Sequence, residues 1–192
     1  MAKILENMYR SIVLGAILAL ILIVAYHGDH ISGADYWGPF FTWLHVLSGI
    51  TWIGLLYYFN MVQTPTMPKI PAELKPGVGK YILPEALFWF RWSAMATIVT
   101  GLIVATLNGY VHQALTLEQP ARTIGTGMWL GIIMWFNVWF IIWPNQKKVM
   151  GLTPADDAAK AKAGRVAMLT SRVNFVLSIP MLYCMVAARL VG

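Results

Sequence analysis

Hydrophobic positions along the chain gather into five long runs that short polar stretches separate. A transmembrane helix needs about 20 mainly apolar residues to cross the hydrocarbon core of a bilayer. The runs cover residues about 11–26, 36–61, 84–108, 124–143 and 166–190. The first run is short, but apolar residues upstream of it allow the helix to begin earlier. The pattern therefore predicts an all-α integral membrane protein, residues 1–192 forming a single membrane domain that is a bundle of five transmembrane helices.

The two longest polar connections are predicted to be loops rather than further domains. Residues 62–83 are punctuated by prolines, which favours a loop. In residues 144–165 we expect Thr153 to cap a polar helical extension that leads into the last run, with Pro154 at the first helical position. A signal peptide is the alternative for the first run. No convincing small-x-small cleavage site precedes the polar stretch 27–30, which favours an anchored helix.

Composition supports the membrane interpretation. Hydrophobic residues make up 58% of the 192 positions and charged residues only 11%, whereas soluble domains have about 25% charged residues. A soluble enzyme, a disordered chain and a collagen-like repeat are therefore excluded. The single cysteine, Cys184, excludes an internal disulfide framework, a zinc ribbon, an iron–sulfur site and covalently attached haem c.

The net charge of +6 is distributed unevenly between the two sides of the predicted bundle. If the N-terminus is cytoplasmic, ten basic residues lie on the cytoplasmic side and two on the outer side. The ten are Lys3, Arg10, Lys69, Lys75, Lys80, Lys147, Lys148, Lys160, Lys162 and Arg165, and the two are Arg122 and Arg189. This excess follows the positive-inside rule. It predicts a bacterial inner-membrane protein with a cytoplasmic N-terminus and a periplasmic C-terminus.

All four histidines fall in the outer half of the predicted bundle: His27, His30, His45 and His112. His45 lies about eight residues past the outer boundary of the second run, which is about 12 Å inside at 1.5 Å per residue. Gly49 and Trp52 follow on the same helical face, where a glycine leaves room for a flat macrocycle and an aromatic ring can pack on its edge. Imidazole is a common haem ligand. We therefore expect a haem b site near the periplasmic face.

In that site His45 is the axial ligand, and either His112 or His27 supplies the second ligand to the haem iron. Two alternatives remain. The imidazole of His45 can hydrogen-bond to a Ser, a Thr or a backbone carbonyl of a neighbouring helix. His27 and His30 can be solvated residues at the interface, and a copper or zinc site that combines them with Asp29 is a weaker possibility.

Two arginines are predicted inside the membrane, where a charge is costly and often functional. Arg91 lies in the third run and Arg172 in the fifth. Either guanidinium could hold a haem propionate or an anionic substrate. Alternatively, Arg91 pairs with Glu85 or the arginines extend to the inner headgroups. Other polar and small residues in the runs are expected to join helices: Asn60 and Asn137 by hydrogen bonds, and the stripes Ser93, Thr97, Gly101, Ala105, Gly109 and Gly127, Gly131 by close packing.

Three stretches resemble the membrane domain of bacterial membrane-bound urate oxidases, the urate hydroxylase (PuuD) family. The first is Trp43 to Gly54, Trp-Leu-His-Val-Leu-Ser-Gly-Ile-Thr-Trp-Ile-Gly. The second is Trp89-Phe90-Arg91-Trp92, which is similar to the Trp-Phe-Lys-Trp run of that family. The third is Met134 to Lys148, which includes Pro-Asn-Gln-Lys-Lys and is the most specific of the three. The first pattern also occurs in other haem-linked membrane families, such as the HemJ-type protoporphyrinogen oxidases and the copper-resistance D proteins.

The resemblance implies a redox-active membrane domain that oxidises urate and passes electrons to a cytochrome c domain fused at its C-terminus. No such domain follows in this sequence, so we expect a separate cytochrome c or respiratory partner to accept the electrons. Three positions depart from the family pattern. Ser93 stands in place of an acid, and Val173 and Arg189 stand where the family has histidines.

Three functions are compatible with these observations. The first is a haem b electron-transfer protein with urate or another small reductant as donor. The second is a non-catalytic accessory subunit of a larger membrane complex, in which the small-residue stripes and aromatic faces serve assembly. A small-solute transporter is the least favoured, because the five runs show no repeated halves with broken helices.

Overall fold

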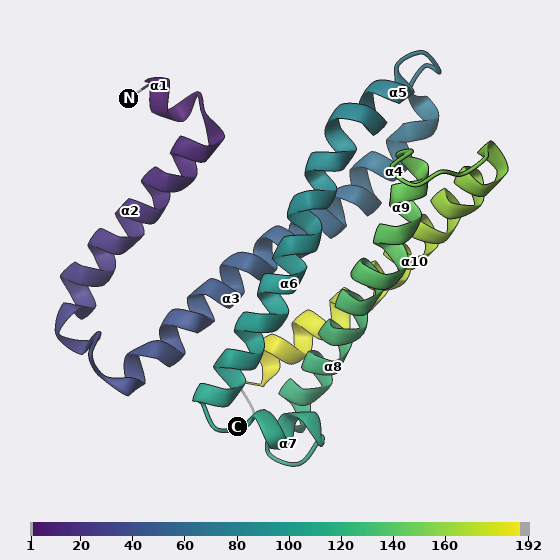
Figure 1. Ribbon diagram of the computed structural model, residues 1–192. Coiled ribbons are helices and arrows are strands. Elements are labelled where there is room, and N and C mark those ends of the chain that lie inside the picture. The colour runs from purple at the N-terminus through teal and green to yellow at the C-terminus, as the bar shows by residue number, and fades with distance from the viewer. Residues whose placement is uncertain (1, 189–192) are drawn as a thin grey trace. The chain divides into compact units, whose positions relative to one another are not determined.

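The computed structural model describes residues 2–188, which are helical apart from turns and short connections (Figure 1). Arg189, one of the two basic residues predicted on the outer side, lies outside the described part. Five helices are long and apolar enough to cross a membrane. They are Met8–His30, Ala34–Lys69, Lys75–Leu107, Arg122–Val149 and Asp157–Ala187. The all-helical class and the number of long apolar helices among residues 2–188 are thus as predicted.

The chain divides into two units, of which the first ends at Phe40. This unit contains α1 (Ala2–Leu5), α2 (Met8–His27) and the beginning of α3 (Ala34–Tyr57). The side chain of Asn7 caps α2 by accepting a hydrogen bond from the backbone N–H of Arg10 at 3.1 Å. At 20 residues α2 is about 30 Å long, the thickness of a hydrocarbon core. None of its residues is buried.

The second unit holds the rest of the chain and the hydrophobic core. Its helices are the remainder of α3, α4 (Thr64–Thr66), α5 (Lys75–Gly77), α6 (Leu83–Leu107), α7 (Val111–Leu115), α8 (Arg122–Phe136), α9 (Trp143–Val149) and α10 (Asp157–Ala187). Helix α10 runs beside α8 and α9, and α6 packs on α8 (Figure 1). The core consists of Trp52, Leu56, Phe59, Leu83, Leu87, Phe90, Ala94, Met134, Val138, Ile142, Ala167 and Met181.

The connection predicted for residues 62–83 is mostly helical. The second long helix continues to Lys69 and the third begins at Lys75, so that only residues 70–74 are left outside helices. Pro65, Pro68 and Pro76 each occupy the first turn of a short helical segment. A backbone N–H has no intrahelical partner at that position, and proline is therefore tolerated there. The prolines thus lie where one helical segment gives way to the next, but they did not indicate that the segments themselves are helical.

The N-cap of the last long helix differs from the expected one. Asp156, not Thr153, caps α10, and its carboxylate accepts a hydrogen bond from the backbone N–H of Ala159 at 2.7 Å. An Asp at this position satisfies one of the free N–H groups of the first turn and also complements the helix dipole. The prediction of Thr153 as the cap was therefore wrong by three residues, although the helical extension itself is present.

Polar side chains join the helices of the second unit as predicted. The amide of Asn60 donates to the hydroxyl of Ser171 at 2.8 Å. The amide of Asn137 donates to the side-chain oxygen of Asn174 at 2.8 Å, and Asn174 donates in turn to the carbonyl of Met134 at 2.9 Å. Asn174 is fully buried. These bonds join α10 to α8 and to the π-helical segments Tyr58–Gln63 and Asn137–Ile142, which continue α3 and α8.

The small-residue stripes have two different roles. A Cβ added at Gly127 on α8 would lie 2.9 Å from the Cβ of Cys184 on α10, so glycine is what allows these helices their close approach. Gly109, in contrast, lies beyond the end of α6 with φ of +76°. It serves the turn rather than helix packing, because positive φ favours glycine.

Candidate functional site

His45 lies on α3 and faces α6. Its Nδ1 atom is 2.9 Å from the backbone carbonyl oxygen of Thr97, and the hydroxyl of Thr100 lies 3.4 Å from the same nitrogen. A carbonyl oxygen can only accept, so Nδ1 carries the proton and donates it. In the neutral imidazole Nε2 is then the nitrogen with the free lone pair. No hydrogen bond engages Nε2 within residues 2–188.

Gly101 on α6 provides the space for the imidazole of His45. A Cβ built on Gly101 would lie 2.8 Å from Cε1 and 3.0 Å from Nδ1 of that ring, closer than real Cβ contacts. Gly49, which the sequence analysis placed beside His45, also faces α6: its added Cβ would be 3.9 Å from the Thr97 methyl group. The ring is thus held between a carbonyl acceptor and a glycine.

The contact to Thr97 is the kind of hydrogen bond that the sequence analysis gave as the alternative to haem ligation. The two interpretations are compatible because they use different nitrogens. A metal-ligating histidine commonly donates its other ring N–H to a backbone carbonyl or carboxylate, which fixes the tautomer and the ring orientation. The hydrogen bond therefore leaves His45 available as a ligand.

The other predicted haem neighbours occupy different environments. Trp52 is 1% exposed and belongs to the hydrophobic core. His112 is exposed on α7. His27 ends α2 in the first unit, where its ring lies 6.3 Å from the ring of Tyr36. Neither a hydrogen bond nor a ring contact joins His45 to His112 in the described chain, so the second ligand stays a prediction.

A site with several metal-ligating side chains is not formed by residues 2–188, since no group of three or more His, Cys, Asp or Glu side chains gathers there. A haem needs only one or two protein ligands. Within residues 2–188 the structure therefore does not assemble a copper or zinc site of the kind considered for His27, Asp29 and His30. A haem at His45 does not require such a group.

Arg91 belongs to a second cluster, which lies nearer the N-terminal end of α6 than the contacts of His45. Its guanidinium carbon lies 3.4 Å from the ring centroid of Trp143 and 5.6 Å from that of Trp139. Its Nε donates to the carbonyl of Leu87 at 3.2 Å. The ammonium nitrogen of Lys147 lies 5.9 Å from the ring of Trp143. We call Arg91, Trp139, Trp143 and Lys147 the cation–aromatic cluster.

The cluster shows why Arg91 need not pair with an acid. Glu85 is exposed, and in the described chain no ion pair joins it to Arg91. Stacking of a guanidinium on an indole face supplies part of the missing stabilisation, about 0.5–2 kcal/mol depending on desolvation. The contact could not be predicted from the sequence, because Arg91 and Trp143 are 52 positions apart in the chain.

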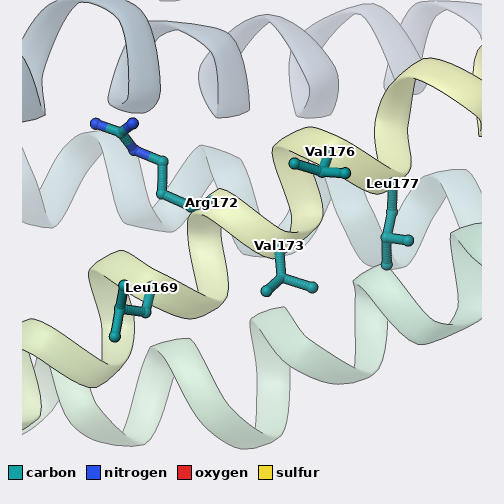
Figure 2. A pocket seen from close by; sticks show the side chains of 5 residues that line it. All are labelled: Leu169, Arg172, Val173, Val176 and Leu177. Carbon is teal, nitrogen blue, oxygen red and sulfur yellow. The ribbon is translucent and has the colours of Figure 1, made fainter.

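Arg172 lies on an exposed face of α10. A shallow groove on this face is lined by Leu169, Arg172, Val173, Val176 and Leu177, which Figure 2 shows as side chains of one helix. Four of these five residues are apolar, and no ion pair or hydrogen bond engages the Arg172 guanidinium within residues 2–188. The structure thus gives the two predicted intramembrane arginines different surroundings.

Comparison with known proteins gives one match. Residues 113–190 match the model of the family described as Urate oxidase N-terminal. Over this stretch the chain is related to urate oxidases. The matched residues include three members of the cation–aromatic cluster, Trp139, Trp143 and Lys147, whereas Arg91 and His45 precede them. No curated protein and no solved structure matches the chain.

Proposed function

We propose that the protein is a membrane-embedded haem b redox protein that resembles the membrane domain of membrane-bound urate oxidase. It takes electrons from urate or a similar small reductant and passes them to a separate cytochrome c or respiratory partner. The chain lies in the bacterial inner membrane with its N-terminus in the cytoplasm, and the haem lies near the periplasmic face.

The observation that carries the proposal is the hydrogen bond from Nδ1 of His45 to the Thr97 carbonyl. It fixes the tautomer in which Nε2 is the ligating nitrogen. The glycine at position 101 leaves room for the ring, and polar side chains inside a membrane are rare and often functional. The residues present therefore fit a haem whose axial ligand is His45. When bound, the haem supplies one-electron oxidation and reduction.

The match to the Urate oxidase N-terminal family supports urate as the electron donor. Two-electron oxidation of urate with addition of one water releases two protons and two electrons, and a separate one-electron carrier would accept the electrons in two transfers. Within this scheme His45 holds the acceptor in place, and the Thr97 carbonyl keeps its imidazole oriented. Removal of a hydrogen-bond acceptor that orients a metal-ligating histidine typically lowers metal affinity or activity by about 10–100-fold.

Anaerobic reduction by urate tests this function. The purified protein is mixed with urate without oxygen, and the absorbance spectrum is compared with that after addition of dithionite, which gives the total reducible haem. We expect urate to reduce the haem of the wild type and of His30→Ala, and no haem signal in His45→Ala. Absence of reduction by urate in a protein that dithionite reduces would reject urate as donor and leave the haem assignment intact.

An accessory subunit of a larger membrane complex is the second candidate, and the exposed face of α10 favours it. Arg172 stands there among apolar side chains without an ion pair in the described chain. A carboxylate on a partner helix would compensate its charge. Purification in mild detergent distinguishes the two functions: a haem-free protein that co-purifies with larger redox subunits would favour the accessory function.

A further inference from the structure

The cation–aromatic cluster contains two positive charges without a compensating acid. Arg91 and Lys147 both lie against the indole of Trp143. The ion pair that the structure forms within residues 2–188 is Lys160 with Asp157, at the beginning of α10. Two cations that share one aromatic ring repel each other, so an anion between them would be favourable.

Arg91 also presents a hydrogen-bonding edge that the protein does not use. Of the five N–H groups of a guanidinium, the one on Nε donates to Leu87. Those on the two terminal nitrogens have no acceptor in the described chain. Stacking on Trp143 holds the plane of the group. The terminal fork of an arginine matches two adjacent planar acceptor atoms.

Two further polar atoms near the cluster are buried without a partner within residues 2–188. One is the indole Nε1 of Trp139, a donor, and the other is the side-chain Oε1 of Gln146, an acceptor. Gln146 lies three residues after Trp143 on α9, which places both on neighbouring positions of the helix surface. Buried polar atoms are nearly always hydrogen-bonded in folded proteins, so each of these calls for a partner.

The combination distinguishes between classes of anion. A phosphate group offers mainly acceptors and would make use of the cations and the Trp139 N–H, but it would leave the acceptor Oε1 of Gln146 without a donor. A planar anionic heterocycle offers adjacent acceptors for the arginine fork, N–H groups for an amide oxygen and a flat face for aromatic rings. The donors, the acceptor and the aromatic surface together favour the heterocycle.

We propose that the cation–aromatic cluster, with Gln146, is a binding site for a planar purine-type monoanion such as urate. The inference rests on the proposed function and assigns its substrate to this end of α6. Arg91 and Thr97 are six residues apart on that helix, a rise of about 9 Å. The bound anion would then lie within one to two helical turns of the carbonyl that orients His45. In the predicted orientation it lies on the cytoplasmic side of that histidine.

Equilibrium dialysis with radiolabelled urate tests the site without any haem readout. The full chain is reconstituted in phosphatidylcholine nanodiscs, and the wild type is compared with Arg91→Gln, Arg91→Lys, Lys147→Gln and Lys148→Gln. Lys148 is the matched control because it is exposed on the same helix, and within residues 2–188 no cation–π contact joins its side chain to the tryptophans of the cluster. Helical circular dichroism and a single elution peak show that each variant is folded.

We expect saturable binding to the wild type and at least tenfold weaker binding to Arg91→Gln, because the charge-assisted fork is lost. The urate affinity of Arg91→Lys should lie between those of the wild type and Arg91→Gln, because lysine keeps the charge but not the fork of two N–H donors. If Arg91→Gln does not fold, the comparison of Arg91→Lys with the wild type decides instead. Lys147→Gln should bind several-fold more weakly, and Lys148→Gln should match the wild type.

Equal urate affinities of the wild type and Arg91→Gln would overturn this site and leave the proposed function standing. If the wild type binds no urate, the proposed substrate fails together with the site. Phosphatidylglycerol that co-purifies with the wild type but not with Arg91→Gln, while urate binding is unchanged, would make the cluster a lipid site and refute the proposal.

Discussion

Substitution of Gly101 by alanine tests whether the position of His45 depends on that glycine. The new Cβ would meet Cε1 of the imidazole at 2.8 Å, and ordinary contact begins at 3.4 Å. The ring must therefore move by about 0.6 Å or the helices must separate. Either response lengthens the 2.9 Å bond from Nδ1 to the Thr97 carbonyl.

The expected change in stability follows from competing contributions. Overpacking of a well-packed site costs about 1–3 kcal/mol, and a part-buried imidazole N–H that loses its acceptor costs about 1–3 kcal/mol. Alanine in place of glycine inside a helix stabilises the helix by about 1 kcal/mol. We expect Gly101→Ala to lower the free energy of unfolding by about 1–5 kcal/mol, and to shift the spectrum of any haem bound at His45.

Unfolding by sodium dodecyl sulfate in mixed micelles, followed by helical circular dichroism, measures this difference. Gly49→Ala is the matched control, because its added Cβ would make only an ordinary contact of 3.9 Å with the same threonine. It should be as stable as the wild type or slightly more stable. If Gly101→Ala proves as stable as Gly49→Ala, the proposed constraint on the imidazole is wrong.

Three further predictions concern the packing of the bundle. Asn174→Ala removes two hydrogen bonds of a fully buried side chain and should cost about 2–4 kcal/mol in the same unfolding assay. Asn145→Ala loses only a bond within its own helix and should cost less than about 1.5 kcal/mol. Equal losses of stability in the two variants would show that the bonds between helices contribute no more than the bond within one helix. Asp156→Ala should cost about 1 kcal/mol as a lost N-cap and Thr153→Ala close to nothing, so the reverse order would restore the original prediction of the cap. Gly127→Ala should lower stability by about 1–3 kcal/mol, because its Cβ would overlap that of a cysteine on α10; a stability equal to that of the wild type would show that the two helices can separate freely.

The long helices could be predicted from sequence because each is encoded locally by its apolar length. Their ends could not. Pro65, Pro68 and Pro76 interrupt the hydrogen-bonding pattern only where a first turn has N–H groups to spare, and composition does not show which prolines occupy such turns. Asp156 and Thr153 are both good capping residues, and the choice between them depends on the backbone geometry that follows.

The candidate site was predictable in part. The depth of His45 in an apolar run marked it as unusual. Its partner, however, is a backbone carbonyl on another helix, and the residue type at that position does not show that the carbonyl accepts this bond. The four-residue spacing of Ser93, Thr97 and Gly101 was the available indication, since it marks the face of α6 that another helix approaches. Which residue enters the space at Gly101 depends on the register of α3 against α6.

The contact of Arg91 with Trp143 was out of reach for a similar reason. The two residues are 52 positions apart, and their stacking depends on how α6 pairs with α9. Both lie in stretches that the sequence analysis singled out for their resemblance to urate oxidases, and the structure brings these stretches together. A motif shows its function in such cases only when its partner motif is placed beside it.

The reduced-minus-oxidised spectrum of the purified protein is the direct test of the haem assignment, recorded for the wild type, His45→Ala and His30→Ala. We expect the α-band of a b-type haem in the wild type and in His30→Ala, and its loss in His45→Ala with helical content unchanged. A wild-type protein without an α-band, or a His45→Ala variant that keeps it, would contradict the claim that His45 holds a haem.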